Sequence, residues 1–319
     1  MHTKIKKWIL LFVLLVIPFS IYWIFFKSAT NDFVKLAFIG PKIEHNIAYD
    51  SIVKNKIFLP STSNISKDMF LNKEGKQVTI NNIAENKYIE LSEEYLPLSQ
   101  DTLQFLSHHK IPPFSFINHN KDTITNSDYD GNIYIANFIF TTCPNICLNM
   151  TINMRYIQKE LSKYPNIKFL SHTVNPNYDT PEILKQYADR MHIKESNYNF
   201  VTGDKDSIYK IAASYFVNAS EDELAPGGFL HSEYLVIIDK EGRVRSGYSN
   251  FTCSKCGETS KNSKLSCTNC NEKYTYVGNP VGCYNGDGSQ DFVIKDMIKD
   301  VKVLLAEYHQ DKKATKNVE

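Results

Sequence analysis

Two cysteines stand where a buried strand meets a helix, and this junction limits the folds open to the chain. Residues 133–140 (IYIANFIF) form a nearly continuous apolar run of strand length, rich in branched and aromatic side chains. Such a run is typical of a central strand covered on both faces. It leads into Cys143-Pro-Asn-Ile-Cys147 and then into a helical pattern with Met150 and Met154 on one face, where core packing explains both methionines.

Strands and helices alternate around this junction. The pattern predicts a helix that begins near Asp179, with Thr180 as its N-cap and Pro181 in the first helical position. Alternation of this kind indicates an α/β sheet of thioredoxin type over residues 108–310, followed by a flexible tail at 311–319. Further strands are expected at 111–116, 167–174, 198–201, 234–239 and 243–248, and further helices at 206–216 and 290–308.

The N-terminal segment has the composition of a membrane anchor. Residues 8–26 carry no charged side chain, and as a helix they would span roughly 28 Å, close to the thickness of a bilayer's hydrocarbon core. Lys4, Lys6 and Lys7 precede them, which predicts a cytoplasmic N-terminus. A cleaved signal peptide is the alternative, but its apolar core would be shorter and would end in a small-residue cleavage site. We expect residues 1–30 to form a single-pass anchor in a bacterial inner membrane, with the main domain in the periplasm.

Residues 31–107 and the overall charge give weaker signals. Short strand patterns at 56–59, 77–80 and 88–91 indicate a spacer or a small added subdomain without a recognisable motif. The formal net charge is +1, with 22% charged residues. No net field therefore points to nucleic acid or to an acidic substrate.

The position of Cys143 and Cys147 favours redox or metal chemistry. A helix N-terminus favours thiolate over thiol, and thiolate is the form that attacks disulfides and binds metals. Cysteines four residues apart share one face of a helical turn, so both sulfurs can converge on one ion or close a disulfide. Soft thiolates select Cu(I), and a neutral imidazole would complete a three-coordinate site. An ordinary disulfide, or two thiols packed as small apolar groups, is the alternative.

His231 is the candidate imidazole. It follows the loop 227–230 and precedes a predicted buried strand, at a position that faces the cysteines in thioredoxin-like folds. Taken alone, a histidine in a loop is more often a surface or capping residue. His172 lies inside a strand pattern and is interpreted as structural, whereas His108 and His109 are expected at the surface.

Three segments resemble the Sco/SenC family in their order and spacing: 138–147 (FIFTTCPNIC), 173–181 (TVNPNYDTP) and 231–239 (HSEYLVIID). The resemblance covers about residues 111–247 and resumes from residue 282 to the last helix. It implies a thioredoxin-like domain held in a membrane by one N-terminal helix.

The resemblance also implies ligands, a cargo and a partner. Cys143 and Cys147 match the family's copper-binding cysteine pair, and His231 matches its distal histidine. Members help to metallate the binuclear copper site of cytochrome c oxidase, so the implied activity is that of a copper chaperone for the copper-bearing oxidase subunit. Asn175 stands where the family's V-D-P stretch has an aspartate, which puts charge management there in doubt, although Asp179 is retained.

Two other functions remain open. The domain could be a thiol–disulfide oxidoreductase that reduces the cysteines of the oxidase subunit or of other extracytoplasmic targets. It could also be a redox or copper sensor. His231 distinguishes the first of these from a chaperone, because dithiol exchange does not need an imidazole ligand.

A second group of cysteines lies in residues 251–281, outside the resemblance. Two C-x2-C pairs can supply four sulfurs with tetrahedral reach, as in a zinc ribbon. Two disulfides, copper or iron are the alternatives. Cys283 stands alone and is interpreted as a packed thiol. The four candidate zinc ligands are Cys253, Cys256, Cys267 and Cys270.

Overall fold

We describe the fold from a computed structural model of the chain. Most of the described residues belong to one α/β domain, and the others form short strands. The described ranges are 36–53, 56–59, 70–71, 80–83, 86–90, 102–144, 146–246, 251–253, 259–260, 274–276, 284–285 and 291–316.

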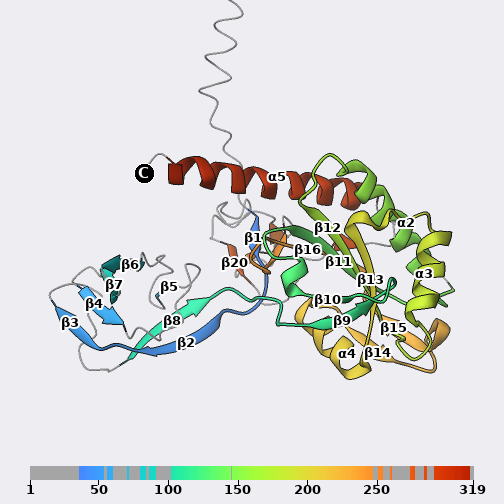
Figure 1. The fold of residues 1–319 in the computed structure, drawn as a ribbon, viewed down its shortest axis with the longest axis horizontal. Helices are drawn as coiled ribbons and strands as arrows, with labels where there is room; N and C mark the ends of the chain where they lie inside the picture. The colour runs from blue at the N-terminus through green and yellow to red at the C-terminus, as the bar shows by residue number, and fades with distance from the viewer. Residues whose placement is uncertain are drawn as a thin grey trace, which may run out of the picture. The chain divides into compact units, whose positions relative to one another are not determined.

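A nine-stranded sheet forms the centre of the domain (Figure 1). Strands β11, β12 and β13 are mutually parallel, while β16 pairs antiparallel with β11 and β17 pairs antiparallel with β16. The segment β17-β16-β11-β12 has the strand order and directions of a thioredoxin-like sheet, which confirms the predicted α/β class. The full order is β1 (Ala37–Phe38), β17 (Val244–Ser246), β16 (Tyr234–Ile238), β11 (Ile133–Ile139), β12 (Ile167–Thr173), β13 (Tyr198–Thr202), β9 (Ser115–Asn118) and β10 (Thr123–Thr125), with β21 (Tyr284–Asn285) also paired to β16.

Helices cover both faces of this sheet (Figure 1). On one face, α2 and α3 are joined by a 2.8 Å hydrogen bond between the hydroxyls of Thr151 and Tyr187. On the other face, Tyr215 at the end of α4 places its ring against Phe138 of β11. The helices are α2 (Ile146–Glu160), α3 (Pro181–Arg190), α4 (Lys205–Ser214) and α5 (Asp291–Lys316), with short 3₁₀ turns η2 (Asn126–Asp128), η3 (Glu195–Asn197) and η4 (Pro226–Gly228).

The local signals in the sequence place these elements well. All seven residues of β11 are buried, as expected for a strand covered on both faces. Thr180 caps α3 by accepting a hydrogen bond from the Ile183 amide, with Pro181 in the first helical position. Helix α5 continues to Lys316, so residues 311–316 of the expected tail are helical.

A buried ionic cluster ties the N-terminal strand to the domain. Arg245 on β17 donates to Asp239 (3.1 Å) and to Glu307 of α5 (2.6 Å). Arg245 also donates to the Leu36 carbonyl, and the Leu36 amide donates to Glu307. The next residues form β1, which pairs with β17. The start of the predicted spacer therefore belongs to the main sheet, because its backbone completes the cluster.

His108 and His109 are half-buried, and each packs against an aromatic ring. The His108 ring stacks on Phe38 of β1 at 3.9 Å between centroids. His109 contacts the Ser214 carbonyl at 2.8 Å and packs on Phe216. Both rings help to hold the segment that precedes the domain.

Two small sheets occupy the region between β1 and the domain, and another lies in the cysteine insert. One sheet pairs β8 with β2 and β5, and a second has the order β3-β4-β7-β6. This favours a small added subdomain over a plain spacer. The bounds are β2 (Ile43–Ala48), β3 (Ser51–Val53), β4 (Lys56–Leu59), β5 (Phe70–Leu71), β6 (Ile80–Ile83), β7 (Asn86–Glu90) and β8 (Thr102–Ser107), and in the insert β18 (Phe251–Cys253), β19 (Thr259–Ser260) and β20 (Tyr274–Tyr276).

The predicted anchor at 8–26 and most of the four-cysteine insert lie outside the described residues. Within the described ranges, no helix combines the length and apolar character that crossing a bilayer requires.

Candidate metal centre

The cysteine pair sits on the loop between β11 and α2. The Cys143 amide donates to the Phe140 carbonyl (3.2 Å), which turns the chain at the end of the strand. The Cys147 amide then points at the Cys143 sulfur, 3.5 Å away. Both cysteines are thiols, with Cys143 half-buried and Cys147 almost completely buried. The junction therefore presents one sulfur toward solvent and one toward the interior.

His231 completes the group from a different part of the chain. It ends β15 (Phe229–His231), which pairs with β14 (Ala219–Glu221) in a two-stranded hairpin rather than lying in an open loop. Its Nε2 lies 3.2 Å from the Cys147 sulfur. Its Nδ1 lies 3.2 Å from the Ser232 carbonyl, which can only accept, so Nδ1 carries the proton. In the neutral ring Nε2 thus keeps its lone pair toward the sulfur, as a metal ligand requires.

Burial changes the protonation expected for Cys147. The pKa of the Cys147 thiol lies well above its usual range. The largest cause is a hydrogen bond with Cys143, and the next largest is burial. Position at a helix N-terminus favours thiolate, whereas at Cys147 the neighbouring sulfur and burial favour the thiol. A metal ion that binds this sulfur must displace its proton.

Gly227 allows the hairpin to approach the cysteine loop closely. Its backbone has a left-handed φ of 82°, and a Cβ there would lie 2.7 Å from the Phe140 ring and 3.4 Å from Pro144. The Phe140 ring in turn meets His231 edge to face, at 5.7 Å between centroids. Phe140 therefore forms the packed contact between the two halves of the site. Sequence reasoning missed this role, although two adjacent glycines before His231 were a signal of close approach.

Asp179 holds the start of the cysteine loop through hydrogen bonds. Its buried carboxylate accepts hydrogen bonds from the Thr141 amide (3.1 Å) and from the Thr141 and Thr173 hydroxyls. Burial raises the pKa of this carboxyl, and those hydrogen bonds partly oppose the rise. The ends of β11 and β12 are thereby joined to the start of α3. Asn175 lies in the turn between β12 and α3, and its backbone N–H donates to the Thr173 hydroxyl (3.0 Å).

The other predicted residues fall into two groups. Met150, Met154 and His172 are buried core residues, as the sequence predicted. Within the described residues, no three or more His, Cys, Asp or Glu side chains are already arranged to hold an ion. The structure thus brings Cys147 and His231 into contact with Cys143 beside them, and the ligand set stays a prediction. The side chains of the four insert cysteines and Cys283 lie outside the described part of the chain.

A thioredoxin-like sheet with a dithiol at the β11–α2 junction and an imidazole on the facing hairpin defines a class of thiol and metal-handling domains. Residues 104–256 match the model of the SCO1/SenC family. Over this region, a little under half of the chain, the sequence is similar to that family. The SCO1 protein homolog of Bacillus subtilis is 27% identical over 143 residues, which cover 44% of this chain and 74% of the relative.

Solved structures show similar but more distant matches. BsSco, a member of the Sco family of cytochrome c oxidase assembly proteins, is 24% identical with a TM-score of 0.44, covering 61% of this chain and 93% of that one. Yeast Sco1 with copper bound is 24% identical with a TM-score of 0.36, covering 42% of this chain and 75% of that one.

Proposed function

We propose that this protein is a copper chaperone that takes up copper through Cys143, Cys147 and His231 and passes it to the copper-bearing subunit of cytochrome c oxidase. The observation that carries the proposal is the 3.2 Å approach of the His231 Nε2 to the Cys147 sulfur. Two soft sulfurs and one imidazole suit Cu(I). The similarity of residues 104–256 to the SCO1/SenC family, whose yeast member Sco1 has been solved with copper, supports the same cargo.

Uptake requires a small rearrangement and a proton release. Cys143 turns its sulfur from the Cys147 amide toward the pair formed by Cys147 and His231, which the half-buried position of Cys143 permits. Copper then displaces the thiol protons, so two thiolates offset the charge of the ion. Transfer follows when ligands of the recipient replace these three, one at a time.

Removal of the imidazole tests the proposal. The variant His231→Ala should bind Cu(I) about 100-fold more weakly or worse, because loss of a ligand exceeds the effect of losing an outer partner. Its Cys143–Cys147 pair should still reduce a model disulfide at close to the wild-type rate. Competition with a Cu(I) chelator and a thiol-exchange assay measure the two quantities on the same preparations.

His309→Ala is the matched control, since His309 is an exposed histidine on α5 and its loss should change neither quantity. Full copper affinity in His231→Ala would refute the three-ligand site. The half-buried Cys143 beside the buried Cys147 would then favour the second candidate, a thiol–disulfide oxidoreductase acting on extracytoplasmic targets.

The approach of the hairpin gives a second test. Gly227→Ala should weaken Cu(I) binding by about tenfold, because the new methyl group meets the Phe140 ring and moves His231 from the cysteines. Gly228→Ala is its control: Gly228 has nearly the same φ (83°) but open space at the Cβ position, so it carries the backbone strain without the displacement. Equal affinities in the two variants would show that Phe140 does not set the geometry of the site.

Two further proposals rest on sequence patterns. We infer that residues 8–26 anchor the chain in the inner membrane, which would place the domain in the periplasm. We also infer that Cys253, Cys256, Cys267 and Cys270 hold a structural zinc ion. Metal analysis separates the two cysteine groups: Cys253→Ser should lose zinc and keep copper, while Cys147→Ser should do the reverse.

A further inference from the structure

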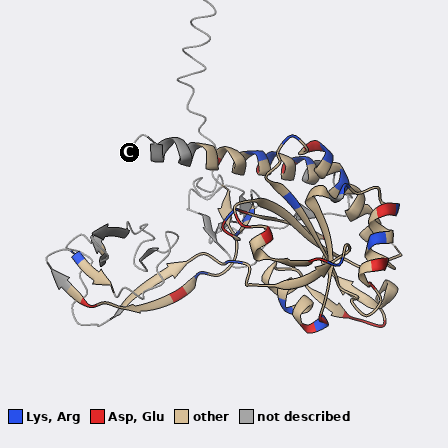
Figure 2. Cartoon of the chain, viewed as in Figure 1, with Lys and Arg blue, Asp and Glu red and all other residues tan. Residues whose placement is uncertain are grey.

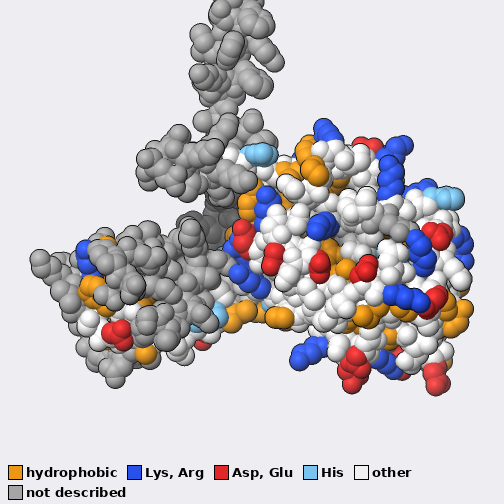
Figure 3. Space-filling view, in the orientation of Figure 1, with side chains coloured by type: hydrophobic (Ala, Val, Ile, Leu, Met, Phe, Trp, Pro, Cys, Tyr) orange, Lys and Arg blue, Asp and Glu red, His pale blue; other side chains and the backbone are white. Residues whose placement is uncertain are grey.

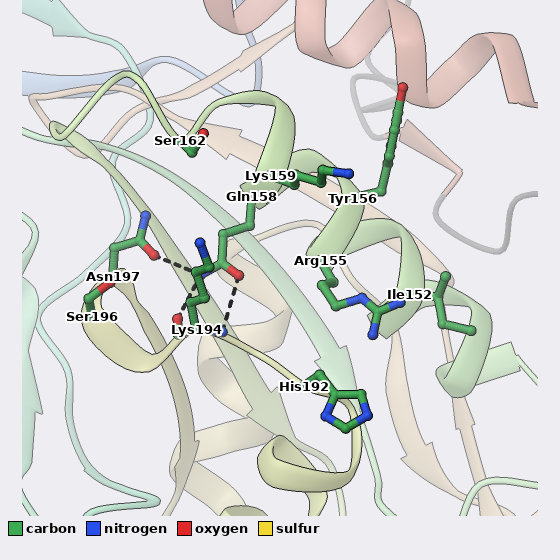
Figure 4. Close-up of a pocket in the computed structure, with 10 residues that line it drawn as sticks. All are labelled: Ile152, Arg155, Tyr156, Gln158, Lys159, Ser162, His192, Lys194, Ser196 and Asn197. Carbon is green, nitrogen blue, oxygen red and sulfur yellow. Dashed lines mark hydrogen bonds between the residues drawn. The ribbon is translucent and has the colours of Figure 1, made fainter.

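A groove with a basic lining lies beside the half of α2 that is remote from the cysteines. It has a volume of about 770 Å³ and runs between α2 and the loop that follows α3 (Figure 4). Gln158 fixes its floor, since its amide group donates 2.7 Å hydrogen bonds to the Lys194 carbonyl and to Asn197. The groove is therefore built by packing between two elements. Its lining residues are Ile152, Arg155, Tyr156, Gln158, Lys159, Ser162, His192, Lys194, Ser196 and Asn197.

The charged side chains described in this groove are all cationic. Arg155 and Lys159 contribute cations one helical turn apart on α2, and Lys194 contributes one from the loop, while none of the lining side chains that the structure describes is acidic. Among the described residues these three cations make no ion pair. Arg155 donates one bond to the Met191 carbonyl (3.0 Å), which holds the guanidinium and leaves further donors for a ligand. Figure 2 marks the Lys and Arg positions on the helices of this end of the domain in blue, and Figure 3 shows basic and acidic side chains interspersed over the domain surface.

An apolar stripe connects the groove with the cysteine site. Leu148, Ile152 and Tyr156 follow one another at helical spacing on the exposed side of α2, with 48%, 41% and 41% of their surface exposed. Leu148 is the residue after Cys147, so the stripe starts at the candidate metal centre. In Figure 4, Ile152 and the Arg155 guanidinium lie on the side of the groove that holds His192.

We infer that this groove and stripe form a docking surface for an acidic segment of a partner protein. Three cations spread over two walls match several carboxylates along a chain, whereas a single small anion needs donors that converge on one point. A hollow flanked by Ser162, Ser196 and Asn197 suits a peptide, whose backbone also needs hydrogen-bond partners, better than the flat surface of a membrane. The inference does not depend on copper.

Peptide binding tests the inference with the full-length chain. The probe is a labelled peptide of eight glutamates, compared by fluorescence anisotropy with its eight-glutamine counterpart. We expect the glutamate peptide to bind at least about tenfold more tightly, with a preference that falls as salt is added. The triple variant Arg155→Gln, Lys159→Gln and Lys194→Gln should remove at least about tenfold of this affinity and leave Cu(I) binding unchanged.

The control variant carries the same change of net charge outside the groove: Lys121→Gln, Lys210→Gln and Lys299→Gln. It should lose less than about twofold. Equal losses in the two triple variants would overturn the inference, since binding would then follow net charge alone. The inference also fails if phosphatidylglycerol vesicles or inorganic pyrophosphate, and not the glutamate peptide, bind in a manner that needs the three groove cations. Those results would assign the groove to a lipid surface or to a small anion.

Discussion

Arg245→Ala should lower the free energy of unfolding of the domain by about 3–5 kcal/mol. Only 4% of the Arg245 side chain is exposed, and its guanidinium bonds both Asp239 and Glu307. Without it, two buried carboxylates lose their shared cation, and only Arg243 remains beside Asp239 (3.2 Å). The Leu36 carbonyl also loses its donor, so β1 should detach from β17 before the rest of the sheet unfolds.

Urea unfolding followed by far-ultraviolet circular dichroism measures this loss, with Lys299→Ala as the control. Lys299 forms an exposed ion pair with Asp296 (3.0 Å), and its removal should change stability by less than about 1 kcal/mol. Arg245→Met combined with Glu307→Gln should be less destabilising than the sum of the two single changes, because the second removes a charge that the first leaves unpaired. A loss below about 1 kcal/mol in Arg245→Ala would show that the cluster is not a net source of stability.

His172 should make the domain less stable in mild acid. Its ring is fully buried, neither of its nitrogens has a hydrogen-bond partner, and it stacks on Phe138 at 4.8 Å between centroids. Burial lowers the pKa of His172 to about 3 in the folded state, against about 6.5 when unfolded. Below pH 6.5 the unfolded chain binds a proton that the folded chain excludes. Stability from this residue is therefore complete above pH 6.5 and falls by about 1.4 kcal/mol per pH unit as the pH drops toward 3.

Between pH 7.5 and pH 5 this predicts a loss of about 2 kcal/mol that His172→Phe should abolish. The measured quantity is the change in unfolding free energy between the two pH values, so a repacking effect that is equal at both cancels. Carboxyl groups such as Asp179 titrate in both proteins and cancel in the comparison. His309→Gln, at an exposed position, should keep the wild-type dependence. If His172→Phe keeps it too, another group governs the acid response.

The local part of this architecture could be predicted from the sequence. A run of branched and aromatic residues predicted β11, and the capping pattern at Thr180 and Pro181 predicted the start of α3. The strand before Cys143 and the helix that contains Cys147 predicted the position of the cysteine pair. Each of these signals lies within a few neighbouring residues. Hydrophobic periodicity and helix capping depend on residues that are close together in the sequence, so they can predict local backbone structure.

Contacts between distant segments could not be predicted in this way. Leu36 and Arg245 are 209 positions apart, and nothing near Leu36 marks its backbone as a partner of a buried cation. The acceptor role of Asp179 toward Thr141 was equally hidden, since a carboxylate before an N-cap usually suggests a helix signal. His231 was placed opposite the cysteines by analogy with a fold, and the contact through Gly227 and Phe140 emerged only when the hairpin was packed against the loop.

The unequal burial of the two sulfurs imposes a sequence of events on any reaction at this centre. A visiting thiol or a recipient's ligand meets Cys143 first, because the Cys147 sulfur is shielded by its own helix and by the His231 ring. Mixed disulfides should therefore form at Cys143 alone, with Cys147 as the resolving thiol that later displaces the visitor. For the proposed copper cargo, the bond to Cys143 would be exchanged first, and Cys147 and His231 would be the last ligands to release the ion.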